Sequence, residues 1–121
     1  MLFRSLSAII NFKRDLRQGV SKFWNKGQCV REENYKDGLL EGVTEDFTTD
    51  GTLIQSATYS RGQLDGVIVR FWLNGNVMEE TDYSEGEIIG EARLYDERGK
   101  RISDDKEKSI VGTLTKVFRG E

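Results

Sequence analysis

The chain has 121 residues, of which 36% are apolar and 32% are charged, and its formal net charge is −3. This length suits one domain, residues 1–121, and the low apolar content favours a single sheet with a solvated face over a two-layer fold. Because histidine is absent and Cys29 is the only cysteine, the commonest general base and a structural zinc site are excluded. We therefore expect a non-catalytic protein without metal or cofactor.

Residues 1–11 contain the only apolar run that could act as a targeting signal. It is broken by Arg4, Ser5 and Ser7, it is too short to span a bilayer, and no cleavage pattern follows it. We expect a soluble, cytoplasmic protein in which residues 1–11 form a strand or helical turn that caps the first repeat. A weak membrane-surface anchor is the alternative.

A unit of 24 residues occurs three times without a gap, at 35–58, 59–82 and 83–106. Each copy places a tyrosine, two glycines, an aromatic residue and a third glycine at the same positions. These five columns are Tyr35, Tyr59 and Tyr83; Gly38, Gly62 and Gly86; Gly42, Gly66 and Gly90; Phe47, Phe71 and Tyr95; and Gly51, Gly75 and Gly99. A fixed period of this kind predicts a repeat architecture.

A degenerate first copy occupies residues 12–34. Gly19 aligns with Gly42 at an offset of 23, whereas Phe23 aligns with Phe47 at 24, so we place a missing residue between Gly19 and Phe23. Beyond the last copy, residues 107–121 are expected to form a C-terminal cap, because 105–118 resemble the first half of a further unit.

Two chain reversals in each copy predict β-hairpins. Asn74-Gly75 and Asp50-Gly51 are strong signals for a two-residue type I′ turn, in which both residues need positive φ. The segment 61–66 carries two glycines and predicts the reversal that joins consecutive hairpins. The predicted fold is all-β: a single-layer antiparallel meander of about eight or nine strands, built from about four repeats.

Two columns are apolar in every copy, and we expect them to form the core. They are Phe23, Phe47, Phe71 and Tyr95, and Val30, Ile54, Met78 and Ile102. Alternation along a strand sends the column beside the aromatic one to the opposite face. That column includes Trp24 and Trp72, which either cover the second face of a thin sheet or anchor a partner.

The spacing of tyrosine, glycines and aromatic residue over residues 12–104 resembles the MORN-variant repeat of bacterial proteins. The resemblance implies a hairpin-repeat fold and a surface for protein contacts, and many relatives are described as antitoxins of toxin–antitoxin pairs. It implies no catalytic residues.

Charge is uneven along the chain, and this is the main indication of a partner. Residues 32–97 hold 16 Asp or Glu and four Lys or Arg, whereas residues 1–31 hold one acid and seven bases. Such a block repels nucleic acid and steers a basic protein towards itself. Its densest run, predicted to bind the partner together with the two tryptophans, is Glu79, Glu80, Asp82, Glu85 and Glu87. The alternative is that these acids are solvated positions that keep sheet edges from pairing.

These observations favour an antitoxin or immunity protein that neutralises a basic toxin by direct binding. One alternative is a scaffold or homo-oligomer that pairs through free strand edges. Another is a peripheral membrane module that uses residues 1–12 and the nearby basic side chains.

Overall fold

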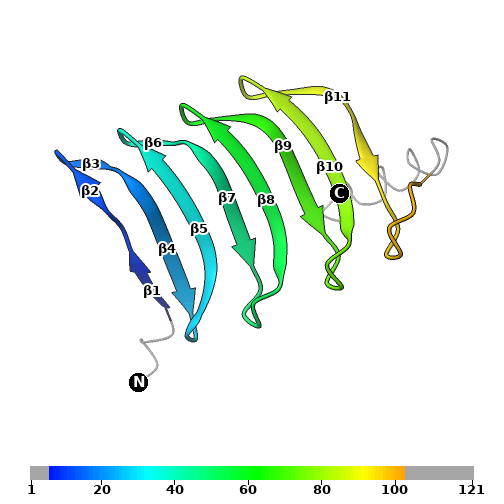
Figure 1. Ribbon diagram of the computed structural model, residues 1–121, viewed down its shortest axis with the longest axis horizontal. Helices are drawn as coiled ribbons and strands as arrows, with labels where there is room; N and C mark the ends of the chain where they lie inside the picture. The colour runs from blue at the N-terminus through cyan, green and yellow to red at the C-terminus, as the bar shows by residue number, and fades with distance from the viewer. Residues whose placement is uncertain (1–5, 103–121) are drawn as a thin grey trace, which may run out of the picture.

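The computed structural model describes residues 6–102, and every regular element in this range is a β-strand (Figure 1). The strands are β1 (Leu6–Ile9), β2 (Phe12–Lys13), β3 (Leu16–Arg17), β4 (Gly19–Asn25), β5 (Gln28–Lys36), β6 (Leu39–Leu40), β7 (Gly42–Phe47), β8 (Leu53–Ser60), β9 (Gln63–Phe71), β10 (Val77–Ser84) and β11 (Glu87–Leu94). The all-β prediction is confirmed. The end of the last predicted repeat and the expected C-terminal cap lie outside the described residues.

The strands pair antiparallel in a nine-stranded sheet of order β1-β4-β5-β7-β8-β9-β10-β11, in which β6 also pairs with β5. The short strands β2 and β3 form a separate pair. Figure 1 shows the large sheet as one row of strands, with β1 at one end and β11 at the other. The described part is therefore the predicted antiparallel meander, and the expected N-terminal cap contributes strand β1 against β4.

Two kinds of reversal alternate along the chain, at opposite ends of the strands (Figure 1). The turns Asp37-Gly38, Arg61-Gly62 and Glu85-Gly86 have two residues, both with positive φ, which is the type I′ pattern. At the other end of the strands, the Gly75 N–H donates to Trp72 O at 2.9 Å and the Trp72 N–H donates to Asn76 O at 2.8 Å. This is a three-residue loop in which only the glycine has positive φ.

The type I′ prediction for Asn74-Gly75 and Asp50-Gly51 is therefore wrong, because one extra loop residue lets a type I turn and a left-handed glycine close the hairpin. The first copy differs here. Lys26-Gly27 is a two-residue turn with φ of 54° and 79°.

This shorter loop is where the first copy lacks a residue, and the predicted position between Gly19 and Phe23 is also wrong. Trp24 pairs with Cys29 as Phe47 pairs with Leu53 and Phe71 with Val77. Trp24, and not Phe23, is the structural counterpart of Phe47, Phe71 and Tyr95. Each of these pairs lies beside a register shift that leaves Val30, Ile54 or Met78 as the extra residue of a β-bulge.

The most buried row of the sheet consists mainly of small and polar side chains. The most buried of the described residues are Ser21 (1% exposed), Thr44 (2%), Leu94 (3%), Ala57 (4%) and Glu33 (7%). The two apolar columns expected to form the core are only half-buried. In a single layer no second sheet covers a large ring, whereas short side chains are covered by longer neighbours on the same face.

The two-residue turns are stacked on one another by a repeated set of contacts. The N–H groups of Gly38, Gly62 and Gly86 donate to the carbonyls of Arg17, Leu40 and Leu64 at 2.8–2.9 Å. In addition, the side chains of Gln18, Glu41 and Asp65 accept from the N–H groups of Asp37, Arg61 and Glu85. These contacts hold each hairpin in register with the one before it.

Candidate functional site

The two faces of the sheet carry different chemistry, and strand register assigns residues to them. Residues directly opposite in antiparallel strands share a face, and successive residues alternate. The Trp24 face carries Trp24, Lys22, Glu32, Glu45, Val69, Glu80 and Arg93. The Tyr35 face carries Tyr35, Phe23, Arg31, Glu33, Asp46, Arg70, Glu79 and Leu94.

On the Tyr35 face, Arg31 ties β5 to β7. Its Nε donates to Glu33 Oε2 at 2.7 Å and its Nη1 to Asp46 Oδ1 at 2.8 Å. The Tyr35 hydroxyl donates to the other oxygen of Glu33 at 3.0 Å and accepts from Arg17 Nη1 at 3.0 Å. Burial lowers the pKa of Arg31, but the hydrogen bonds to Glu33 and Asp46 outweigh it and the pKa is raised. The charges of Arg31, Glu33 and Asp46 are thus paired with one another.

On the Trp24 face, Arg93 holds two acids of the neighbouring strand. Its Nε donates to Glu80 Oε1 at 3.1 Å and its Nη1 to Asp82 Oδ2 at 2.7 Å. The Tyr95 hydroxyl also donates to Glu80, at 3.0 Å. The hydrogen bond from Arg93 lowers the pKa of Asp82, so this carboxylate stays ionised to lower pH than usual. Both acids at this end of the face are therefore held by the same arginine, which balances one of their two negative charges.

Nearer the N-terminus, the Trp24 face places two acids against each other. Glu32 on β5 lies directly opposite Glu45 on β7, an arrangement that destabilises a sheet. The nearest base, Lys22, reaches only 4.0 Å from Glu32, and Glu45 has no ion-pair partner in the described part of the chain. Both side chains are half-buried. Of the two acidic pairs on this face, this one has the weaker contact with a base, and it adjoins the strand that carries Trp24.

The acidic run predicted from the sequence is divided by the fold. Glu80 and Asp82 lie on the Trp24 face, whereas Glu79 lies on the Tyr35 face, with Oε1 3.5 Å from Arg70 Nη1. Glu85 belongs to a two-residue turn and Glu87 begins β11. The five acids therefore do not form one surface.

The two predicted tryptophans do not share a column either. Trp24 pairs within the β4–β5 ladder, whereas Trp72 follows β9 and opens the three-residue loop, with its Nε1 donating to Tyr95 O at 3.1 Å. Both rings are half-buried.

Glu32 and Glu45 were missed in the sequence analysis because they stand thirteen positions apart. Only the register of β5 and β7 brings them together.

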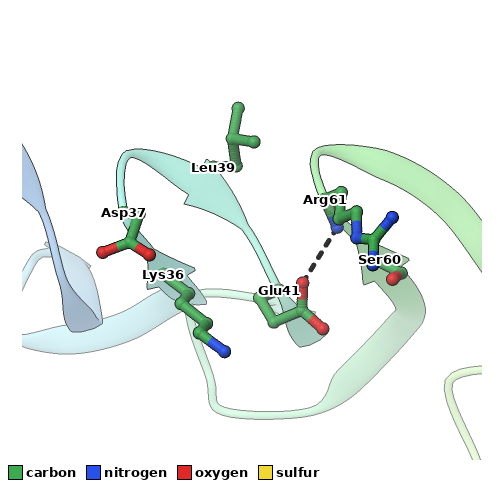
Figure 2. A pocket seen from close by; sticks show the side chains of 6 residues that line it. All are labelled: Lys36, Asp37, Leu39, Glu41, Ser60 and Arg61. Carbon is green, nitrogen blue, oxygen red and sulfur yellow. Dashed lines mark hydrogen bonds between the residues drawn. The ribbon is translucent and has the colours of Figure 1, made fainter.

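A shallow hollow of about 410 Å³ lies between two neighbouring turns. Figure 2 shows its lining residues, Lys36, Asp37, Leu39, Glu41, Ser60 and Arg61, with the Glu41 carboxylate bonded to the backbone N–H of Arg61 and Leu39 apart from the polar side chains. Glu41 is thus occupied in stacking the turns. The hollow is therefore a gap between two stacked two-residue turns, at the end of the strands where these turns recur.

Within residues 6–102, no group of three or more Asp, Glu or Cys side chains is placed to hold a metal ion. No helix in this range could cross a membrane. Searches with this chain match no protein-family model and no curated protein.

Proposed function

We propose that this chain is a non-catalytic, cytoplasmic binding module of the MORN-variant repeat type, which neutralises a basic toxin by direct contact through its Trp24 face. The observation that carries the proposal is the opposed pair Glu32 and Glu45. Two carboxylates side by side on a half-buried surface cost stability, and a cation from a partner would remove that cost on binding.

Trp24 adds apolar surface beside this charge. Protein interfaces commonly combine a large aromatic anchor with charge complementarity, in which the charges set the association rate and the partner's identity. At the other end of the same face, Glu80 and Asp82 already have a close cationic partner in Arg93, at 3.1 Å and 2.7 Å. The proposed contact is therefore centred on β4, β5 and β7 and not on the acidic run around residue 80.

The repeat type is supported by the spacing of the paired residues. Cys29, Leu53, Val77 and Arg101 follow one another at intervals of 24, and each pairs with the aromatic residue that precedes its loop. A stack of such hairpins has no enclosed cavity for a small substrate and presents broad faces suited to protein contacts.

The test uses a basic partner captured from the native cell, most directly the product of a neighbouring gene, and measures its affinity for purified variants. Glu45→Gln should weaken binding at least about fivefold at low salt, because it removes a charge complementary to the partner. The same change should raise the thermal midpoint slightly, because it relieves the repulsion with Glu32. Glu97→Gln, which removes an exposed charge from a loop, is the matched control.

Lower affinity combined with higher stability distinguishes a binding role from a structural one. An affinity that is unchanged by both Glu45→Gln and Glu32→Gln would remove the Trp24 face from the interface.

A further inference from the structure

Three valines form a row on the Trp24 face. They are Val20 on β4, Val43 on β7 and Val67 on β9, and strand pairing sets each of them on this face. Because β5 lies between β4 and β7, and β8 lies between β7 and β9, each valine is two strands from the next. Neighbouring strands are about 4.8 Å apart, so the step along this valine row is about 10 Å.

The valine row is accessible, and a polar neighbour within it is already bonded inside the sheet. Val20 is 36% exposed and Val43 is 43% exposed, and Val67 is half-buried. Between the first two valines, Asn34 Nδ2 donates to Val43 O at 2.8 Å. This amide nitrogen is thus occupied, and the valines are left as surface for an apolar contact.

The opposed pair Glu32 and Glu45 lies beside the valine row. Glu45 stands two residues after Val43 on β7, and Glu32 stands two residues before Asn34 on β5. Two residues of strand place both carboxylates about 7 Å from the row. Protein interfaces combine apolar anchors with complementary charge, so this surface fits an element with one line of aliphatic side chains and Lys or Arg beside it.

A step of about 10 Å matches an α-helix and does not match an extended segment. Seven residues of helix rise about 10.5 Å and bring a side chain back to the same face. In an extended segment, the residues of one face are about 7 Å or about 13 Å apart, and they fall out of step with the row. A helix that reaches all three valines needs about 15 residues.

We propose that the basic partner lays an amphipathic helix across the valine row, with an aliphatic side chain at every seventh position over the valines. A Lys or Arg four residues after the first aliphatic residue lies about 6 Å further along the helix. That position is between β5 and β7, the strands that carry Glu32 and Glu45. The inference rests on the proposed function and names the element of the partner that the Trp24 face recognises.

The test uses the full-length chain and two synthetic helical peptides of three heptads and equal composition. One has leucine at every seventh position and lysine four residues after each leucine, and the other has the same leucines distributed around the helix. The first peptide should bind at least about tenfold more tightly at low salt, measured by the fluorescence anisotropy of a label on the peptide.

Val43→Thr keeps the β-branched shape but removes apolar surface, and it should weaken binding of the first peptide about threefold to tenfold. Ile88→Thr is the matched control, because Ile88 is 60% exposed but lies opposite Tyr83 on the Tyr35 face. This change should leave the affinity unaltered.

Equal binding or no binding of the two peptides would overturn the proposal, and so would binding of the first peptide that Val43→Thr does not weaken. Tighter binding of a peptide in which leucine and lysine alternate strictly would assign the row to an extended segment instead. A wild-type dimer that Val43→Thr separates in sedimentation velocity would assign it to a second copy of the chain. If Glu45→Gln still weakens binding of the captured partner in these cases, the proposed function stands and only the helix is refuted.

Discussion

Glycines at one repeat position differ in their surroundings, and this predicts how strongly each resists substitution. Gly66 has φ of 127°, and a Cβ added there would lie 3.0 Å from Thr58 Cβ and 3.2 Å from Thr58 Cγ2. Gly90, two strands further on, has φ of 69°, and an added Cβ would meet nothing within 4 Å. Both residues lie at a register shift beside a tyrosine-bearing strand.

Gly66→Ala should therefore cost about 1–5.6 kcal/mol of unfolding free energy, with a central value of about 3 kcal/mol. A residue forced to this φ is strained by about 1–3 kcal/mol, and the contact with Thr58 adds overpacking of about 1–3 kcal/mol, since Cβ is fixed to the backbone and cannot move aside. The reduced entropy of the unfolded chain offsets about 0.4–1 kcal/mol. For Gly90→Ala no contact forms, and the left-handed φ alone costs about 1–2 kcal/mol. With the same offset of about 0.4–1 kcal/mol, the net cost should be about 0–1.6 kcal/mol.

Gly42→Ala provides a third point in the series, with φ of 93° and the nearest atom, Asn34 Cβ, at 3.8 Å. Its cost should fall between the other two. Urea unfolding, followed by the fluorescence of Trp24 and Trp72, gives all three free energies, provided that the slope against urea is unchanged. Equal costs for Gly66→Ala and Gly90→Ala would show that neither φ nor the Thr58 contact governs this position.

Two further predictions concern charged side chains. Arg31→Met should cost about 2–4 kcal/mol of unfolding free energy, because it leaves the nearly buried Glu33 carboxylate without its cation. Arg70→Met changes a residue on the same face that is paired more loosely with Glu79, and it should cost less than about 1 kcal/mol in the same urea titration. Similar losses in the two variants would contradict this prediction. The hydrogen bond from Arg93 lowers the pKa of Asp82 in the folded protein. The ionised Asp82 therefore stabilises the fold fully above the unfolded-state pKa of about 4, and this contribution is lost as the pH falls through the lower pKa of the folded state. The thermal midpoint of the wild type should consequently converge with that of Asp82→Asn as the pH falls below about 4. A difference that stays constant on acidification would refute the assignment.

The strands and their antiparallel order could be predicted because they depend on local features that recur along the chain. A glycine-hinged reversal every half-repeat allows little except a meander. The turn types could not be predicted, because Asn74-Gly75 is compatible with a two-residue and a three-residue loop. The choice depends on which residues pair before and after it. Trp72 bonds to Asn76 next to the Phe71–Val77 pair, and this leaves three residues to close the loop.

The candidate site was harder to predict for a related reason. An acidic run such as Glu79-Glu80 looks continuous in the sequence, but strand alternation sends its members to opposite faces. The opposed pair Glu32 and Glu45 shows no local signal and depends on the register of two strands. The Asp37-Gly38 turn joins these two strands, and neither glutamate carries a sequence signal of the other.

The junction between β5 and β7 joins the stability of the fold to its proposed function. It has two paired positions: Arg31 opposite Asp46 on the Tyr35 face, and Glu32 opposite Glu45 on the Trp24 face. The first pair attracts at 2.8 Å, and the second repels. In a single-layer sheet the two faces can be charged independently, because neither has to fill a common core. The ion pair on one face can thus hold the strands together, while the other face keeps an acidic pair that Lys22 approaches only to 4.0 Å and that the proposed cationic partner would contact.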